Sequence, residues 1–493
     1  MGGSGRLGVA YARRDAAFFA RRQLRRHANV RHLWALGVGA VISGHFSGWN
    51  GGLLQGGWGG MLIATLIIGL MYLGLTFAIA EMSPALPHTG GAYSFARTAM
   101  GPWGGFLTGL AENVEYVLAP AVVAFFIGSY MSGIFGTPEA WQPAWWAGCY
   151  VLFVGLNIGG VALSFRVTLV VTLLALACLA IFWISALPRV DFGRWALDVG
   201  PGGTLLPAGH GPFLPNGPWG VLTAMPFAVW LFLAIEQLPL ASEEAIDPRR
   251  DMPRGIFLSF ATLAFSALAV LALNPAVPGV GAFALGHSGE PLLAGFRALY
   301  GEGWARLLAL VAVLGLVASF HTVTFAQGRQ IYSLSRAGYF PPILSLTHSR
   351  HRTPHVAMIA GAAAGMAVLC GIWFTAGAER GTLIGFTLLN MAVFGAMLSY
   401  VMQALSFILL RLRQPHIPRP FRSPLGIAGA LAVLCIALVT LGFQIAGDAS
   451  YRAGIAGVAL WFAICIGYFA LFGRHRLILS PEEDFALDHA GKG

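Results

Sequence analysis

Charged side chains are scarce in this chain. Only 10% of its 493 residues are Asp, Glu, Lys or Arg, compared with about 25% in an average soluble domain, and the only lysine is Lys492. Hydrophobic residues make up 57% of the sequence, and the mean hydropathy is +0.72. Because apolar segments of at least about 18 residues recur along the chain, this composition predicts an all-α integral membrane protein that crosses the lipid bilayer many times.

Cysteines and sequence motifs for cofactors are also few. The five cysteines lie in apolar segments without paired spacing, which predicts packing residues rather than disulfides or metal ligands. The sequence contains neither a P-loop for ATP nor an H-E-x-x-H metal motif. We therefore expect no enzyme activity, no cofactor, no metal and no transport driven by ATP.

Twelve apolar segments are long enough to cross a bilayer, with boundaries set to within about 2–4 residues. They occupy residues 32–52, 58–81, 104–131, 144–163, 167–187, 218–240, 254–276, 304–328, 355–375, 382–410, 425–446 and 453–473. The loops on one side contain only Arg189, Arg194, Arg297, Arg306, Arg380 and Arg452, and all other basic residues lie on the side of the termini. This bias predicts cytoplasmic termini and a location in the plasma (inner) membrane. It also accounts for the net charge of +10 without a nucleic-acid partner.

Two of the predicted spans contain interruptions. The first holds GVGAVISGHFSGWN (37–50), and the sixth holds LAIEQLPLASEE (233–244). Interrupted helices at corresponding positions of two halves are typical of inverted-repeat transporters, in which the freed backbone groups line a ligand site. Alternatively, the small residues only permit close helix packing. We predict five-helix repeats at 31–187 and 218–410, an extracellular loop at 188–217 and two extra helices at 411–475, with a basic cytoplasmic tail at 1–30 and a second cytoplasmic tail at 476–493.

Several longer motifs resemble one transporter superfamily. GGAYSFARTAMGPWGGFLTG, VEYVLAPAVVAFFIGSY, EEAIDPRRDMPRG and SRAGYFP resemble the amino acid–polyamine–organocation superfamily, and among its members the ethanolamine permeases most closely. The resemblance extends from about Trp34 to the eleventh span. It implies a leucine-transporter-like fold, alternating access and a site between the first, third, sixth and eighth spans. Two residues depart from the family pattern: His45 stands where an acidic residue is usual, and Gln237 where glycine is usual.

The expected substrate site combines the two interruptions with the third and eighth spans. An ammonium group would pair with Glu236 and stack on the face of Trp230, although tryptophan is also common at membrane interfaces. The expected substrate-binding residues are Ile42, Ser43, Gly44, His45, Phe46, Glu115, Tyr116, Trp230, Ala234, Glu236, Gln237 and His321. Ser319 and Thr322 are expected to matter only if they contact carbonyls of the first span.

Four residues are candidates for carrying a coupling proton. Glu112 and Glu115 lie three residues apart and share a helix face, and Glu236 and His45 lie at the interruptions. The alternative for each is a structural role, in which it satisfies backbone groups. Proton-coupled members of the superfamily that this chain resembles often have a lysine in the fifth span, where sodium would bind. Here that span contains none, which excludes a lysine in this role and favours exchange, facilitation, or protons carried by the four residues above.

The expected function is secondary transport of a small amine such as ethanolamine, imported or exchanged, with proton coupling. The alternative is an amino acid permease, and a sensor or a channel is less favoured. We expect a cytoplasmic gate in which Arg249, Arg250 and Arg254 pair with Glu243, Glu244 or Asp247. Alternatively, these pairs only anchor the topology. The sequence predicts no oligomeric state.

Overall fold

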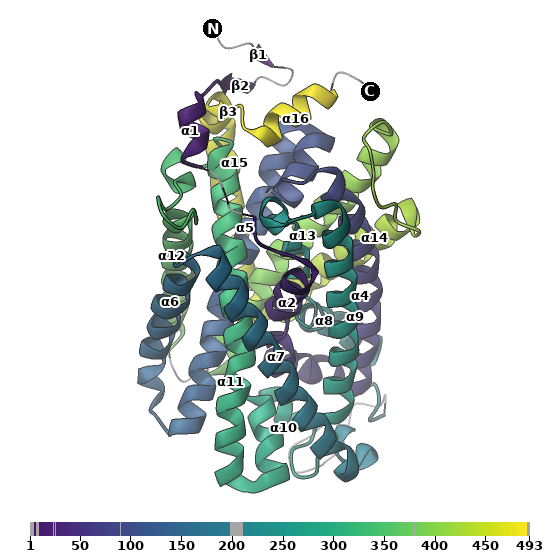
Figure 1. Cartoon of the computed structure of the whole chain (residues 1–493). Coiled ribbons are helices and arrows are strands. Elements are labelled where there is room, and N and C mark those ends of the chain that lie inside the picture. Colours follow the sequence, from purple (N-terminus) through teal and green to yellow (C-terminus); the bar gives the residue numbers. More distant parts are fainter. Residues whose placement is uncertain are drawn as a thin grey trace.

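The structure is a bundle of long helices whose two ends differ. The computed structural model describes residues 4–5, 9–22, 24, 26–88, 90–197, 211–377 and 381–490. Both termini lie at the same end of the bundle, which we call the tail end, at the top of Figure 1; α10 (Ala282–His287) lies at the opposite end, the loop end. At the tail end, β1 (Ser4–Gly5) pairs antiparallel with β2 (Val9–Ala12), and β2 pairs in parallel with β3 (Leu477–Ile478), with Tyr11 opposite Leu477.

Twelve elements correspond to the twelve predicted spans. They are α2 (Val30–Val41) with α3 (Ser43–Phe46), α4 (Gly51–Ala85), α5 (Ala92–Phe135), α6 (Gln142–Ile158), α7 (Val161–Ala186), α8 (Gly217–Trp230) with the 3₁₀ helix η5 (Ile235–Glu244), α9 (Pro248–Leu273), α11 (Pro291–Arg336), α12 (His355–Ala376), α13 (Thr382–Arg413), α14 (Gly426–Ala446) and α15 (Arg452–Leu471). Two short helices, α1 (Ala16–Ala20) and α16 (Pro481–Ala490), lie at the tail end.

Among the described residues, ten of these elements are long and apolar enough to cross a membrane. The other two are α2–α3, interrupted after 12 residues, and α6, with 17 residues. The mostly helical membrane architecture is therefore confirmed, whereas the count of twelve and the two five-helix repeats stay predictions. The predicted loop 188–217 lies partly outside the described residues.

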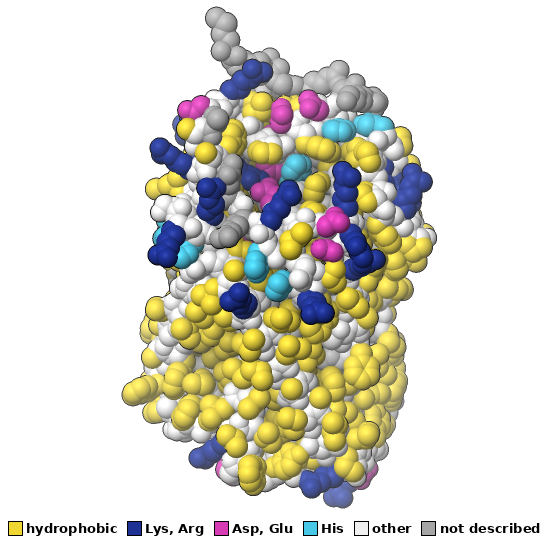
Figure 2. All heavy atoms as spheres, in the orientation of Figure 1, with side chains coloured by type: hydrophobic (Ala, Val, Ile, Leu, Met, Phe, Trp, Pro, Cys, Tyr) yellow, Lys and Arg dark blue, Asp and Glu magenta, His cyan; other side chains and the backbone are white. Residues whose placement is uncertain are grey.

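Burial separates the inner helices from those that face lipid. The most apolar window of α8–η5 is 78% buried and that of α5 is 72% buried, whereas the window around α15 is only 17% buried. Figure 2 shows a broad apolar surface around the middle of the molecule, with most of the visible Arg and His side chains nearer the tail end. The helices that carry the two interruptions are thus enclosed by the rest of the bundle.

Local sequence explains where the key helices begin. The side chain of Asn29 accepts hydrogen bonds from the amides of Arg31 and His32, so it satisfies donors that the first turn of α2 leaves free. Proline at the first position of α9 and of α11 fixes a helical φ where no amide hydrogen bond is lost. In the folded chain the first interruption lies against Ser319, in the interior of α11.

Candidate substrate site between two broken helices

A side chain from another helix interrupts the first span. The amide of Ser43 donates to Oγ of Ser319 at 2.9 Å, and that hydroxyl donates to the carbonyl of Gly39 at 2.7 Å. In an unbroken helix the Ser43 amide would bond directly to the Gly39 carbonyl. The hydroxyl of Ser319 in α11 is thus inserted between them. Ser319 therefore contacts a carbonyl of the first span, which was the condition for its expected importance.

The first span leaves helical geometry fully after Phe46. Ser47 is extended, and Gly48 has φ +93°, a conformation that favours glycine. A Cβ at Gly48 would also lie 2.6 Å from Nε1 of Trp230. The carbonyls that this turn frees are satisfied by two side chains: Tyr130 donates to Phe46 at 2.8 Å, and Trp230 donates to Ser47 at 3.0 Å.

The second interruption begins directly after Trp230. Ala234 adopts a left-handed conformation with φ 80°, which costs a residue with a side chain about 1–2 kcal/mol. The chain continues as the ten-residue η5, although 3₁₀ helices longer than about four residues are uncommon. The carbonyl of Leu231, at this turn, is 3.1 Å from Nε2 of His45. The interruptions expected in both spans are therefore present, and they contact each other.

A small cavity lies between the two interruptions. Its volume is about 10 Å³, which is close to the minimum that one water molecule needs. The lining residues are Ala40, Val41, Ser43, Ala119, Val123, Trp230, Leu233, Ala234 and Val323. Of the expected substrate-binding residues, Ser43, Trp230 and Ala234 line this cavity, whose walls are otherwise apolar.

The other residues expected at the first interruption serve packing. Gly44 abuts the second interruption, because a Cβ there would lie 2.3 Å from the carbonyl oxygen of Trp230. Phe46 packs on Gly315 of α11, and Ile42 is fully buried.

The two expected histidines contact helices rather than the cavity. His45 has both ring nitrogens in contact with partners, since Nδ1 lies 2.7 Å from Oγ of Ser266 in α9. His321 lies within 3.0 Å of Asn157 and 3.1 Å of Ser164, on the face of α11 that meets α6 and α7. Gln237 donates to the carbonyl of Leu36 in α2 at 3.3 Å.

Three buried carboxyl groups form a second cluster beside the cavity. Glu115 lies one helical turn from the cavity residue Ala119 on α5, and Glu236 lies two residues beyond Ala234. The two carboxyl groups face each other, and Tyr116 donates to Glu236 at a long 3.4 Å. Glu112 accepts from Gln330 of α11 at 2.8 Å. We call Glu112, Glu115 and Glu236 the inner acidic cluster.

The donors to the inner acidic cluster include Gln330 and the hydroxyls of Tyr116 and Tyr400, but they leave several oxygens unpaired. Both oxygens of Glu115, and one each of Glu112 and Glu236, are buried without a donor among the described residues. None of the ion pairs in the described part of the chain includes these three residues. Since buried charges are costly unless they are paired, this arrangement suits a proton or a cationic ligand group.

The expected pairs of the gate are wrong. Glu244 pairs with Arg329 at 2.8 Å, with both side chains fully buried, and Glu243 pairs with Arg336 at 2.6 Å. Arg249 and Arg250 are exposed in the first turn of α9. The reason is that the end of η5 faces α11, where residues 329 and 336 lie two turns apart on one side of the helix.

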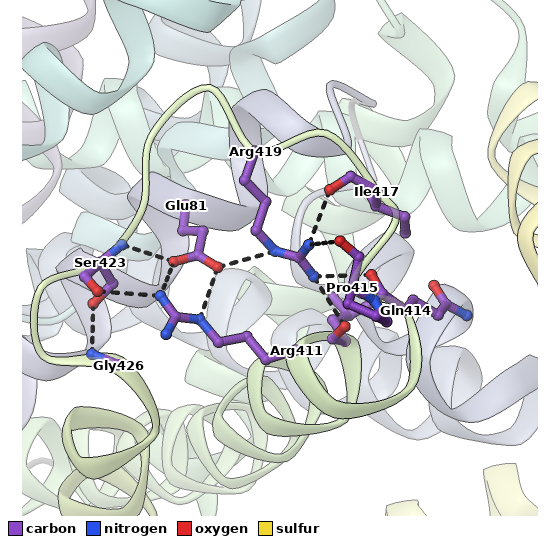
Figure 3. A network of polar contacts seen from close by, with 9 residues as sticks. Glu81, Arg411, Gln414, Pro415, Ile417, Arg419, Ser423 and Gly426 are labelled. Atoms are coloured by element: carbon purple, nitrogen blue, oxygen red, sulfur yellow. Dashed lines mark hydrogen bonds and ion pairs between the residues drawn. The ribbon is translucent and has the colours of Figure 1, made fainter. Parts of the chain in front are cut away.

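A further charged network fixes the tail end of α4 and was not foreseen. Figure 3 shows Glu81 between Arg411 and Arg419, with contacts of 2.6 and 3.1 Å. Its carboxylate also accepts from the amide of Ser423 at 2.7 Å. The loop between α13 and α14 is thus held against α4. The sequence signal is only that Arg411 lies in the last turn of α13 and Arg419 follows that helix, which the charge bias of the loops explains as well.

Comparison with known proteins identifies the family. Residues 29–471 match the family model described as amino acid permease, so the chain belongs to that family, within the amino acid–polyamine–organocation superfamily. It is 27% identical to a branched-chain amino acid permease of Bacillus subtilis, over 86% of this chain and 90% of the relative. It is 25% identical to a methylthioribose transporter of Bacillus subtilis (82% and 85%) and 26% identical to an uncharacterized transporter of Rhizobium meliloti (80% and 81%).

These relatives are permeases and transporters, as expected for a chain that is not an enzyme. The superfamily resemblance is therefore confirmed. The relatives support the amino acid permease alternative better than the closer resemblance to ethanolamine permeases.

Proposed function

We propose that this protein is a secondary transporter of small neutral amino acids that works by alternating access. The observation that carries the proposal is the cavity between two broken helices in a chain of the amino acid permease family. Backbone groups freed inside a membrane are tolerated where they line a ligand site. The small cavity corresponds to a closed state, which would widen when substrate binds.

The two sides of the cavity suit the two charged groups of an amino acid. The substrate carboxylate would bind at the first interruption, beside Ser43, the hydroxyl-bearing residue of the cavity wall. The ammonium group would face Glu236 and Glu115. Glu115 lies one helical turn from the cavity residue Ala119. Because the walls of the cavity are Ala, Val and Leu with Trp230, they suit an apolar side chain.

Proton coupling through the inner acidic cluster completes the proposal. Carboxyls that lack donors and cations bind a proton readily when no substrate ammonium is present. Glu236, with Glu115 and Glu112, is the proposed carrier, and His45 has a structural role. The tail end is proposed to be cytoplasmic because the Arg-rich loops lie there, in the plasma membrane.

Uptake into proteoliposomes tests the proposal. We expect saturable uptake of labelled alanine or valine that competing neutral amino acids reduce and ethanolamine does not, and stimulation by an inward proton gradient. Inhibition by ethanolamine alone would instead support an amine permease. Binding without flux would indicate a sensor, and a non-saturating current would indicate a channel; either result would overturn the proposed transport.

A further inference from the structure

The C-terminal segment is built into the tail end of the bundle. Besides the pairing of β3 with β2, the amide of Ile478 donates to the carbonyl of Ala337, just after α11, at 2.9 Å. α16 then lies across the tail end (Figure 1). In this ten-residue helix Glu482 and Glu483 are 1% and 0% exposed. Burial of two neighbouring acids in a surface helix requires partners below it.

Glu483 anchors α16 to the bundle. Its carboxylate accepts hydrogen bonds from three tyrosines: Tyr93 at 2.8 Å, Tyr11 at 2.9 Å and Tyr339 at 3.0 Å. It also pairs with the guanidinium of Arg97. These partners come from β2, α5 and the segment after α11. One buried side chain thus joins both tails to α5 and to the segment that follows α11.

Glu482 shares an arginine with the second broken helix. The guanidinium of Arg336 pairs with Glu482 and, at 2.6 Å, with Glu243 near the end of η5. Ser333, one turn earlier on α11, donates to Glu482 at 3.3 Å. Arg336 therefore lies between an acidic residue of η5 and one of α16, and the pair with α16 helps to hold its side chain toward η5.

The end of η5 is the part that must move if the tail end opens. Its last residue, Glu244, is tied to Arg329 of α11, and its carbonyl accepts from the amides of His27 and Ala28 before α2, at 2.7 and 2.9 Å. At this layer the segment before α2 is therefore bound to η5, and η5 is bound to α11. An opening toward the tail end must separate them from α11.

We propose that α16 is a latch that holds the tail end closed: while it is docked, Glu482 keeps Arg336 in place to bind Glu243, and so keeps η5 against α11. We infer this on the basis of the alternating access proposed above. When α16 undocks, Arg336 loses Glu482 and retains Glu243 as an acidic partner. Its side chain is then free to turn toward solvent. Opening at the tail end then becomes more frequent. The tail thereby sets the rate of a transport step without touching the substrate.

Hydrogen exchange of the full-length protein tests the latch, and the measurement needs no substrate. Glu482→Gln removes the negative charge that pairs with Arg336, while Glu483 still holds α16. We expect the amides of residues 235–246 to exchange about tenfold faster than in the wild type, because a charge-assisted bond that resists local opening is lost. The matched control is Asp484→Asn, which removes one charge from an exposed position of the same helix and should leave this exchange unchanged.

Each result decides the proposal. Faster exchange of 235–246 in Glu482→Gln supports the latch whether or not α16 also exchanges faster. Wild-type exchange there, in a variant whose α16 has lost protection, overturns it, as does equal acceleration in Asp484→Asn. If Glu482→Gln does not fold, Tyr339→Phe removes one anchor of Glu483 without changing charge, and exchange of 235–246 should rise with that of α16. A failure of amino acid uptake would refute the proposed function without altering these rates.

Discussion

Two buried acidic clusters in this protein differ in what surrounds them. Glu482 and Glu483 at the tail end contact arginines and tyrosine hydroxyls. The inner acidic cluster, one helical turn from the cavity, has a glutamine, the hydroxyls of Tyr116 and Tyr400, and several oxygens without a donor among the described residues. The same residue type at the same burial therefore has opposite consequences. With partners it stabilises the folded chain, and without them it is available for a ligand or a proton.

The comparison is tested most strongly at Glu483. Glu483→Ala leaves Arg97 buried without its acidic partner and removes the acceptor of three tyrosines, so we expect α16 docking to weaken by about 3 kcal/mol. Hydrogen exchange of residues 481–490 measures this. Asp488→Ala, at an exposed position of the same helix, is the control. Protection of α16 that survives in Glu483→Ala would show that the sheet with β3 holds the tail by itself.

At Glu236 the expected effect is on binding, not on stability. Glu236→Gln keeps the shape and removes the charge, so binding of a neutral amino acid should weaken by about 2 kcal/mol. Binding of an analogue without the ammonium group should change much less. Thermal stability should stay the same or rise, since a buried carboxyl group with one oxygen that has no donor among the described residues is removed. The measurements are binding titrations at several pH values and a melting curve. Intact affinity with transport lost would make Glu236 a proton carrier or gate instead of an ammonium partner.

Ser319 extends the comparison of paired and unpaired buried groups to a neutral side chain, whose hydroxyl both donates and accepts a hydrogen bond. Ser319→Ala leaves the Ser43 amide and the Gly39 carbonyl without their partner, which should lower the free energy of unfolding by about 1–3 kcal/mol. Thr324→Val is the control, because that hydroxyl bonds only within its own helix, to Phe320 at 2.6 Å. Denaturant titration in detergent compares them. Equal losses in the two variants would mean that the first interruption does not depend on the inserted hydroxyl.

The smallest effect is expected at His45. Because both its ring nitrogens have partners, Leu231 and Ser266, His45→Asn should leave the pH profile of uptake unchanged and cost about 1 kcal/mol of stability. Uptake measured across pH in His45→Asn and Glu236→Gln separates the two residues. A flattened profile in His45→Asn would return His45 to the proton pathway.

The sequence was sufficient for features that depend on local pattern. Apolar length predicted the helices, and the glycine-rich stretch 37–50 and the polar stretch 233–244 within apolar spans predicted the two interruptions. The sequence was insufficient to predict which charged residues form ion pairs. Glu244 was assigned to arginines five and six residues away, whereas it pairs with Arg329, 85 residues away. Arg97 and Glu483 are 386 residues apart. Such pairs depend on how helices pack, and nothing in the local sequence specifies that packing.

The hydroxyl of Ser319 also has a mechanical meaning. The hydrogen-bond ladder of the first broken helix passes through a side chain of α11, so neither helix can slide or rotate at this level without stretching a bond in the other. A tilt of α11 would be converted into a change of pitch in α2, at the point where the cavity begins. The two helices are therefore coupled at this level. A movement of α11 that displaces Ser319 also displaces the backbone of the first span beside the cavity.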